Sequence, residues 1–429
     1  MVPYKESHVD VLVAGGGTAG VCAAIAASMS GADVRVIDQN GFFGGTLVSG
    51  IVGGFCGIMG AKYAMDDNPE MIIGGVGSMI IDAVREKGGL SALSHSPRFN
   101  TYRYNSCILQ IVLDELICKH AVTSTLHTYI TDACVSNGQV TCVETHSKSG
   151  KERIFPKFVI DATGDADIVY MTGGNYRKDA ANLQPGSFNF RMGGVDPLGR
   201  IPNIPEAARE IARILQEEPD LKLSREDPSF LMAPDYRDVI CTFSRIQVDG
   251  TDAASLTQAE IAGRREVLPT AEFIRKHFPA FKNAYIAGLA SHIGIRETRV
   301  IEGEGVLTEE DVISGRIRPD AIGRCAWPVE RHVNGKTKSE VISLKNGDYY
   351  SIPFDIMIPK NFANLLVVGR AASADKSANA SIRVFGPCAA MGHAAGAASH
   401  IFVKENLSSV KDINIEKLRG LIASQGALL

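Results

Sequence analysis

The sequence has no long apolar run and no strong excess of either charge. No stretch approaches the roughly 20 apolar residues that a membrane-spanning helix needs. The chain carries 44 basic and 48 acidic side chains, a formal net charge of −4. This balance gives no indication of a nucleic-acid or membrane surface. The first seven residues are largely polar and lead into an apolar segment, so we expect no signal peptide.

The cysteines form no recognisable framework. Nine of them, an odd number, occur without a CxxC pair, which argues against a disulfide scaffold, a zinc site or a redox dithiol. We therefore expect reduced thiols, no metal and a cytoplasmic location. Cys56, Cys107 and Cys388 are candidates for covalent attachment of a cofactor, although packing as a small apolar residue is the ordinary role of a free cysteine.

The first forty residues contain the most specific pattern of the chain. An apolar segment at 8–14 runs into Gly15-x-Gly17-x-x-Gly20, an alanine-rich segment follows, and a second apolar segment ends at Asp38. This order predicts a strand, a helix and a strand that bind a dinucleotide. The glycines allow a tight turn, approach of a pyrophosphate and close helix packing. Asp38 is placed to accept hydrogen bonds from the ribose hydroxyls. A carboxylate at this position would repel a 2′-phosphate, so NADP is disfavoured as the ligand.

A second glycine cluster follows the ribose acid. Residues 41–60 are rich in glycine, yet they contain apolar side chains such as Val48, Phe55 and Ile58, which are unusual in a solvated loop. A glycine pair at Gly44-Gly45, just beyond the acid, resembles the two-domain flavoproteins related to glutathione reductase and succinate dehydrogenase. In those proteins this backbone lies along the ribityl chain and the flavin ring.

Two later segments extend the resemblance. Residues 158–165 form an apolar strand that ends in Ala-Thr-Gly-Asp, similar to the strand that returns the flavoprotein chain to the cofactor sheet. Near the C-terminus, a strand at 364–368 meets Gly369, and Gly386-Pro387 leads into a small-residue helix at 389–400. Proline favours a helix start. In these flavoproteins the positive end of that helix faces the negative charge of the reduced ring.

The order of these pieces over residues 8–400 resembles a bacterial family of FAD-dependent oxidoreductases. The implied fold is α/β, a Rossmann-like FAD-binding domain with a parallel sheet and an antiparallel meander at 125–158, and an inserted α+β substrate domain. Inside the insert we expect helices at 204–217 and 258–277 and a strand at 239–246. The expected division is 1–178 for the first part of the FAD-binding domain, 179–355 for the substrate domain, 356–403 for the return segment and 404–429 for a helical tail.

The resemblance implies FAD as the cofactor and a set of contacts to it. His393 departs from the pattern, because glutamine is expected there. The implied contacts are Gly15, Gly17, Thr18, Ala19, Gly20, Asp38, Gln39, Gly44, Gly45, Thr46, Ile130, Ala162, Thr163, Gly164, Asp165, Gly369, Arg370, Gly386, Ala389, Ala390 and Met391.

Candidate groups for the substrate chemistry begin with Arg296 and Arg299. In a helix, this spacing would place both on one face, near Glu302 or Glu304. One interpretation is a structural ion-pair network between domains. The other is a guanidinium clamp for a substrate carboxylate.

A second candidate group surrounds the only tryptophan of the chain, at 327–332. In a strand, Glu330 and His332 would share a face and Arg331 would lie opposite. His332 is then a candidate general base, and the alternative is a solvated strand end. A third group contains His292, Arg383 and His393. Arg383 precedes the small-residue helix and is a candidate for contact with flavin or substrate, whereas a histidine in such a position is usually packed or solvated.

Together these features predict a FAD-dependent dehydrogenase or reductase that moves a hydride between flavin N5 and a small polar metabolite, with a carboxylate indicated by the arginines. Two alternatives stay open, an electron-transfer subunit of a larger complex and a tRNA-modifying flavoprotein. The absence of iron–sulfur motifs means that an electron carrier would need a partner. No second GxGxxG follows a strand, so NAD(P)H is not expected to bind tightly. The expected partners are a small-molecule substrate and a second copy of the chain, with neither nucleic acid nor a membrane.

Overall fold

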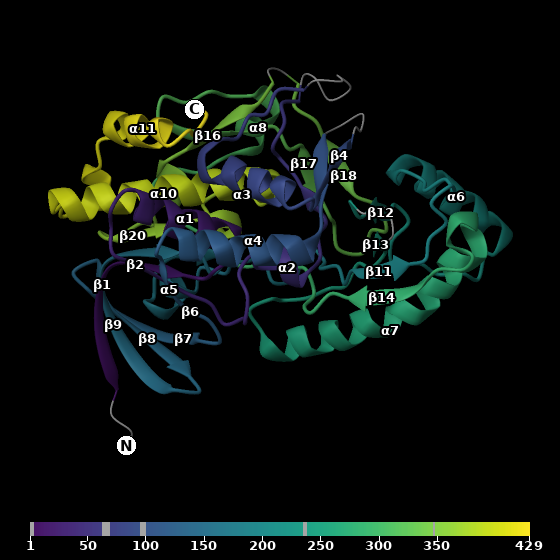
Figure 1. Cartoon of the computed structure of the whole chain (residues 1–429), viewed down its shortest axis with the longest axis horizontal. Helices are drawn as coiled ribbons and strands as arrows, with labels where there is room; N and C mark the ends of the chain where they lie inside the picture. The colour runs from purple at the N-terminus through teal and green to yellow at the C-terminus, as the bar shows by residue number, and fades with distance from the viewer. Residues whose placement is uncertain (1–3, 62–68, 95–99, 235–237, 346–347) are drawn as a thin grey trace.

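A central sheet of seven strands organises the molecule (Figure 1). The computed structural model describes residues 4–61, 69–94, 100–234, 238–345 and 348–429. The strands follow the order β6-β2-β1-β9-β8-β7, and β20 pairs with β9. Their bounds are β1 Lys5–Ala14, β2 Val34–Ile37, β6 Thr123–Thr125, β7 Tyr129–Ser136, β8 Gln139–Ser147, β9 Gly150–Asp161 and β20 Leu365–Val367.

Strand β9 belongs to two parts of this sheet. Its first residues pair with β8 in antiparallel register, and its last residues pair with β20 in parallel register. Along its other edge it runs parallel to β1. The β7–β8 turn is Asn137-Gly138, in which both residues have positive φ, 50° and 76°, as the tightest hairpin turns require. The predicted antiparallel meander is therefore confirmed.

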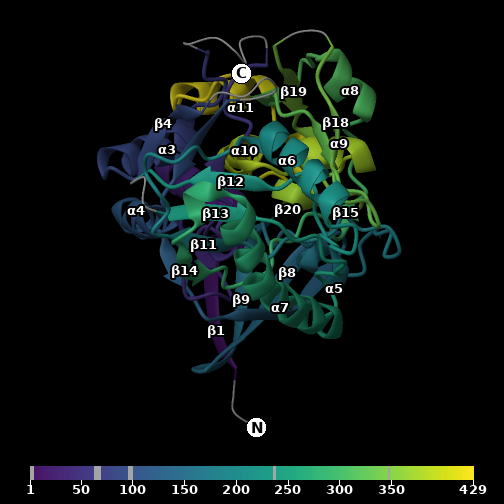
Figure 2. The ribbon, with the colours of Figure 1, turned by 90° about the vertical axis from the view of Figure 1, so that its right-hand side faces the viewer.

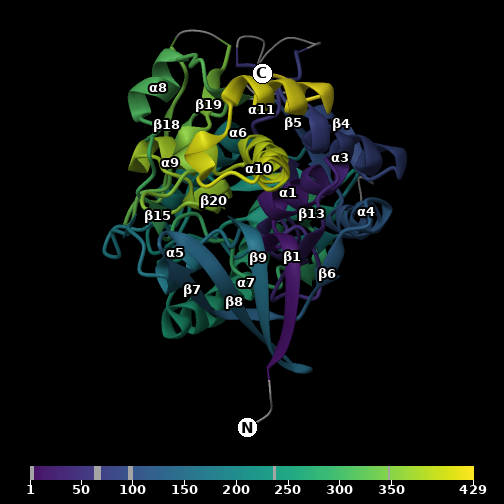
Figure 3. The same cartoon turned by 90° about the vertical axis from the view of Figure 1, so that its left-hand side faces the viewer.

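Two helices from opposite ends of the chain pack against each other beside the central sheet (Figures 1 and 3). They are α1, Thr18–Met29, and α10, Phe385–Glu405. A Cβ atom on Gly392 would lie 2.1 Å from the carbonyl oxygen of Ala19, and one on Gly396 would lie 2.2 Å from that of Ala23. The two glycines thus allow backbone-to-backbone contact. Helix α10 begins earlier than predicted, so Pro387 lies within its first turn.

A second, antiparallel sheet has its own apolar core. Its order is β12-β13-β11-β14, with bounds Ser229–Met232, Asp238–Thr242, Phe190–Gly193 and Tyr285–Leu289. Figures 1 and 2 show α6, Ile204–Glu217, and α7, Ala253–His277, on the outer side of this sheet. The prediction of α6 is confirmed residue by residue, whereas the strand predicted to reach residue 246 ends at Thr242.

The core of this second sheet draws its buried residues from 188–293, together with Ile51. Residues of 307–358 instead belong to the core that contains α1 and α10. Both sets lie within the segment predicted as the substrate domain. The division of the chain into domains stays a prediction.

The remaining elements are short and surround the two main sheets. Among the described residues, no helix is long and apolar enough to cross a membrane. The longer helices are α3 Gly75–Glu86, α4 Ser106–Lys119 and α11 Ile415–Ser424, and α11 is the predicted covering helix of the tail. The others are α2 Thr46–Ser49, α5 Asp167–Met171, α8 Glu309–Ser314, α9 Lys376–Ile382, and the strands β3 Gly54–Phe55, β4 Leu90–Ser94, β5 Thr101–Tyr104, β10 Tyr176–Arg177, β15 Val300–Ile301, β16 Ala321–Cys325, β17 Val329–Arg331, β18 Glu340–Ile342 and β19 Tyr350–Pro353.

The α1–α10 contact predicts a large difference between two glycines that both lie in helices. Gly392→Ala should lower the free energy of unfolding by about 1–3 kcal/mol, because the added methyl group overpacks the contact. Gly420→Ala in α11 is the control. Its Cβ would have no neighbour within 4 Å, so helix propensity should leave stability equal or slightly higher. Thermal unfolding of both variants measures the difference, and equal melting temperatures would contradict this packing.

Candidate functional site

The first glycine loop lies at the carboxyl end of β1. Gly15 has φ 103°, and a Cβ there would be 2.5 Å from the carbonyl oxygen of Ala162. A Cβ on Gly20 would be 1.8 Å from the Gly15 oxygen, whereas one on Gly17 would meet only the Cα of Gly45, at 4.0 Å. No side chain caps α1. The space over Gly17 and the N–H groups of α1 therefore suit the diphosphate of a dinucleotide.

Asp38 connects the end of β2 to this loop. It is 8% exposed. One carboxylate oxygen accepts the Gly16 N–H at 2.6 Å, and the other accepts the backbone and side-chain N–H groups of Asn40 at 2.7 and 2.9 Å. Burial raises the pKa of Asp38, and these hydrogen bonds oppose the rise. Gln39, also an expected contact, is exposed.

The second glycine cluster meets the first. Gly17 and Gly44 form a parallel bridge, and the Gly44 N–H donates to the Gly16 carbonyl at 2.8 Å. Gly44 and Gly45 have φ of 103° and 49°, and the next residue, Thr46, begins α2. The predicted burial of the glycine-rich region is confirmed for Val48, Phe55 and Ile58. The pair thus brings a second stretch of backbone to the edge of the Gly17 loop.

The loop after β9 lies directly beside the Gly15 turn. The Ala162 N–H donates to the Ala14 carbonyl at 2.8 Å. Asp161 is fully buried and accepts hydrogen bonds from Thr163, through N–H and hydroxyl, and from the Ile168 N–H. Burial raises the pKa of Asp161 to about 6. Its carboxyl group holds the turn in shape from inside the protein.

An ion pair joins this loop to the end of β20. The Arg370 guanidinium donates to Asp165 at 2.7 Å and lies against Gly164. Positive φ at Gly369, 82°, turns the chain there, and a Cβ on it would be 3.5 Å from that of Ala19. Loops 15–20, 44–46, 162–165 and 369–370 therefore converge at the carboxyl edge of the sheet. Ligands of open α/β sheets bind at that edge.

The expected contacts on α10 lie differently. The Gly386 N–H donates to the Cys56 carbonyl at 2.9 Å, and a Cβ there would lie 1.9 Å from a neighbouring carbonyl oxygen. Gly386 thus joins α10 to the 41–60 region. A Cβ on Gly77 would be 3.1 Å from the side chain of Ala389, and one on Gly323 would be 2.7 Å from that of Ala390. Met391 is fully buried. Contact of Gly386, Ala389, Ala390 and Met391 with flavin stays a prediction.

Three further expected residues lie on other segments. Ile130 is half-buried on the meander, two residues beyond Thr128, whose N–H donates to the Asp38 carbonyl at 3.0 Å. His393 is 2% exposed, and its Nε2 lies 2.8 Å from the side-chain oxygen of Gln425, so it faces the C-terminal segment. His292 is exposed, and its Nε2 lies 3.1 Å from the side-chain oxygen of Asn40. His292 therefore lies on the ribose-acid side of the site.

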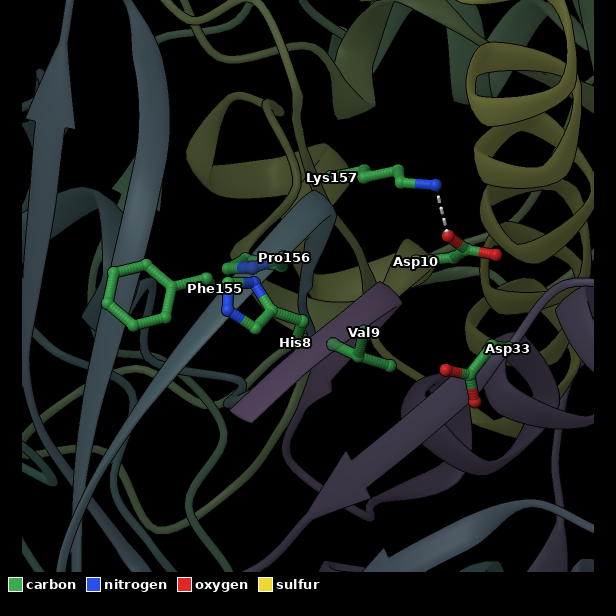
Figure 4. Close-up of a pocket in the computed structure, with 7 residues that line it drawn as sticks. All are labelled: His8, Val9, Asp10, Asp33, Phe155, Pro156 and Lys157. Atoms are coloured by element: carbon green, nitrogen blue, oxygen red, sulfur yellow. Dashed lines mark ion pairs between the residues drawn. The ribbon is translucent and has the colours of Figure 1, made fainter. Parts of the chain in front are cut away.

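A hollow of about 400 Å³ lies at another part of the sheet (Figure 4). Its lining includes Asp33, just before β2, and the ion pair of Asp10 with Lys157 at 2.7 Å. This is the amino end of β2. Since dinucleotides bind at the carboxyl ends of such strands, the converging glycine loops, and not this hollow, are the candidate cofactor site.

The structure separates Arg296 from Arg299. Their segment is not helical, so the expectation of one shared helix face is wrong. Its backbone instead pairs with the chain at Ser187. Arg299 donates to Asp167 at 2.8 Å and lies over the Tyr170 ring, which is a structural ion pair. Arg296 points elsewhere and donates to the Pro185 carbonyl at 2.6 Å and the Ser187 hydroxyl at 3.0 Å.

Arg383 lies next to Arg296 and is held in a similar way. It donates to the backbone carbonyls of Arg296 and Glu330 at 3.3 and 3.1 Å. Within the described part of the chain, neither guanidinium forms an ion pair. Burial lowers the pKa of Arg383 to about 10, and burial together with the charge of Arg383 lowers the pKa of Arg296. Two half-buried positive charges thus have only neutral oxygens as hydrogen-bond partners.

Strand β17 ends at Arg331, so His332 follows the strand, but its side chain lies on the same side as that of Glu330. His332 Nε2 lies 3.8 Å from a Glu330 carboxylate oxygen, while Arg331 pairs with Glu340 on the other side. His332 is 3% exposed. Burial, and then the charges of four arginines, hold its pKa well below the ordinary value. The imidazole is therefore neutral at neutral pH.

Two of those four arginines, Arg225 and Arg245, belong to no sequence motif that would mark them as site residues. Arg225 and Arg245 both donate to one oxygen of Asp227, each at 3.0 Å. Arg245 also donates to the Ser339 hydroxyl at 2.8 Å, which lies 3.4 Å from His332 Nδ1. They stand 20 residues apart in the chain, in a segment without a motif. Only the folding of the second sheet brings them to His332.

Comparison with known proteins agrees with this architecture. The family described as FAD dependent oxidoreductase matches residues 10–422. The comparison with curated proteins found no match. A geranylgeranyl bacteriochlorophyll reductase-like protein from Thermoplasma acidophilum is similar in structure, with 14% identity, TM-score 0.50, and coverage of 98% of this chain and 84% of that chain. The p-nitrophenol 4-monooxygenase of Pseudomonas putida has 10% identity and a TM-score of 0.46, and the match covers 98% of this chain and 85% of that chain.

These likenesses concern the fold alone. The predicted α/β fold with a Rossmann-like domain is confirmed. At 14% identity, the similarity to the Thermoplasma acidophilum protein shows no particular branch of flavoproteins, including the branch related to glutathione reductase and succinate dehydrogenase. That finer relationship stays a prediction.

The position of Asp38 predicts a selective loss of cofactor affinity. Asp38→Asn should weaken FAD binding about 10- to 100-fold, because it replaces charge-assisted hydrogen bonds with neutral ones. Asp33→Asn, on an exposed residue at the other end of β2, is the matched control and should bind FAD normally. Fluorescence titration of the apoprotein with FAD measures both constants. Equal affinity in the two variants would show that Asp38 does not hold the ribose.

Proposed function

This chain belongs to the FAD-dependent oxidoreductase family, and we propose that it moves a hydride between N5 of its FAD and a small polar metabolite that carries a carboxylate. Bound FAD supplies the chemistry of hydride acceptance or donation. The converging glycine loops and Asp38 are the residues that would hold it. The side chains of this protein bind the substrate, orient it and move its proton.

The unpaired charges of Arg296 and Arg383 carry this proposal. Carbonyl and hydroxyl oxygens position both guanidinium groups but do not neutralise them. The carboxylate of Glu330 attracts both guanidinium groups, but among the described residues no carboxylate forms an ion pair with either. A carboxylate that receives two parallel N–H bonds is the natural complement of a guanidinium. The arrangement therefore favours an anionic substrate over a neutral one.

The arginines also lie near the proposed cofactor loops. The Arg370 guanidinium donates to the carbonyl oxygen of Ile295, the residue before Arg296, at 3.3 Å. Arg370 is paired with Asp165, in the loop after β9. A substrate carboxylate on Arg296 and Arg383 would thus be held beside the loops that receive FAD, which is the position that hydride transfer requires.

His332 is suited to handle the proton that accompanies the hydride. As a neutral imidazole it accepts a proton from a substrate that is being oxidised, and in the reverse direction it returns that proton. The Glu330 carboxylate, 3.8 Å away, stabilises the protonated ring. Ser339, near Nδ1, orients the ring from the other side.

The arginine proposal predicts which compounds bleach the flavin. Under anaerobic conditions, the holoenzyme should be reduced by members of a panel of small hydroxy and amino acids, and not by their amides. Arg296→Gln should slow this reduction at least tenfold, because the carboxylate loses a charged partner. Arg331→Gln, on the opposite face of β17, is the control and should reduce at the normal rate. Equal bleaching by acids and amides would refute the proposal.

The pKa of His332 predicts the pH dependence of this reduction. Because burial and the arginines lower that pKa, the proton-accepting form persists as pH falls through the ordinary histidine value of about 6.5. The rate constant for flavin reduction by the best acid should therefore stay constant from pH 8 to 6.5 and fall only below that range. His332→Gln should lower the rate about 10²- to 10⁴-fold with little change in substrate affinity. Stopped-flow absorbance separates the two quantities, and a rate in that variant equal to wild type would exclude His332 as the base.

A further inference from the structure

We propose that the substrate carries a second acidic group, bound by Arg225, which precedes β12, and Arg245, which follows β13. This inference rests on the proposed function, in which Arg296 and Arg383 bind the first carboxylate. It narrows the substrate class to small diacids, with a carboxylate at one end and a carboxylate or a phosphate at the other.

The first observation is an incomplete ion pair. Arg225 and Arg245 both donate to the same Asp227 oxygen, each at 3.0 Å. The other oxygen of Asp227 accepts the Ser339 backbone N–H at 2.7 Å. One carboxylate thus faces two guanidinium groups whose side chains are 6% and 3% exposed. Glu330 also attracts Arg245, but among the described residues Asp227 is the only carboxylate that forms an ion pair with Arg225 or Arg245. At hydrogen-bond distance the site therefore has one more positive than negative charge, which is unfavourable inside the protein unless an anion completes the site.

The second observation is a set of buried donors without acceptors. Nε and Nη1 of Arg245 are buried and have no hydrogen-bond partner. Among the described residues, Arg324, Arg331 and Arg370 each have one such nitrogen, and Arg245 is the only arginine with two. Buried polar groups are nearly always paired in folded proteins. Donors of a charged group that lack an acceptor therefore indicate that the acceptor is an anionic ligand.

A neutral donor adds to this set. The side-chain nitrogen of Gln184 is also buried and without a partner, and Gln184 is 3% exposed. Its side-chain oxygen accepts the His332 backbone N–H at 3.1 Å. The amide nitrogen is therefore held near the histidine and can contribute one more hydrogen bond to an oxyanion.

The two pairs of arginines flank the same histidine. Arg245 reaches His332 through one intermediate hydroxyl, that of Ser339. All four guanidinium charges lower the pKa of His332, after burial itself. The second acidic group would therefore lie only a few bonds from the carbon that exchanges its hydride with the flavin, whose hydroxyl or amino proton His332 accepts. This short separation favours diacids with a short carbon chain.

Binding of matched acids to the oxidised holoenzyme tests the inference without turnover. The probes are dicarboxylates of two to five carbons, the monocarboxylates of equal length, and the phosphono acids in which phosphonate replaces one carboxylate. Perturbation of the flavin absorbance, checked by calorimetry, gives each Kd. We expect the best diacid to bind at least tenfold more tightly than its monoacid. Arg245→Gln should remove this advantage and leave monoacid binding unchanged.

Controls separate local loss of charge from loss of fold. Arg245→Lys keeps the charge and should keep part of the advantage, while Arg264→Gln, on the exposed face of α7, should keep all of it. Flavin content and melting temperature verify that each variant is folded. A phosphono acid that binds better than the dicarboxylate identifies the second group as phosphate-like.

The failures of the two proposals are distinguishable. If monoacids bind in an Arg296-dependent manner but diacids bind no better, the second subsite is refuted and the proposed function stands. A diacid advantage that survives Arg245→Gln also refutes the subsite. If no acid binds and Arg296→Gln changes nothing, both proposals fall together.

Discussion

The backbone contact between α1 and α10 is the constraint on which the site depends. Helix α1 begins at the first glycine loop, and α10 begins just after Arg383. Because Gly392 and Gly396 let the two helices touch through their backbones, the start of α10 has a fixed position relative to the Gly17 loop. In the function proposed above, a cofactor over Gly17 and a substrate at Arg383 would thereby be placed relative to each other by helix packing, and not by a flexible loop.

The guanidinium groups proposed to bind the substrate come from distant parts of the chain and are held by backbone and hydroxyl groups. Arg296 is positioned by carbonyl and hydroxyl oxygens of the 185–187 segment, Arg383 by the backbone of Arg296 and Glu330. Each arginine is thus fixed by groups that cannot neutralise it. The fold thus gathers positive charge around a neutral histidine, and the anionic substrate proposed above would lower the electrostatic cost of that arrangement.

Features encoded by local spacing could be predicted from the sequence. The strand–helix–strand unit ending at Asp38, the meander with its Asn137-Gly138 turn and the helix at 204–217 depend on neighbours within one element. The helical interpretation of Arg296 and Arg299 failed because pairing with the chain at Ser187 overrides a local spacing. Arg225 and Arg245 could not be predicted, since their proximity to His332 arises only from tertiary packing of a segment without periodicity.

The central sheet also has a consequence for how the protein is made. Its middle strands β1, β9 and β20 come from residues 5–14, 150–161 and 365–367, so the sheet is complete only when most of the chain has left the ribosome. Parallel pairing over such sequence separations closes long loops and is slow. During synthesis the apolar faces of β1 and α1 therefore stay uncovered, and nascent chains expose these faces until β20 and α10 have been synthesised.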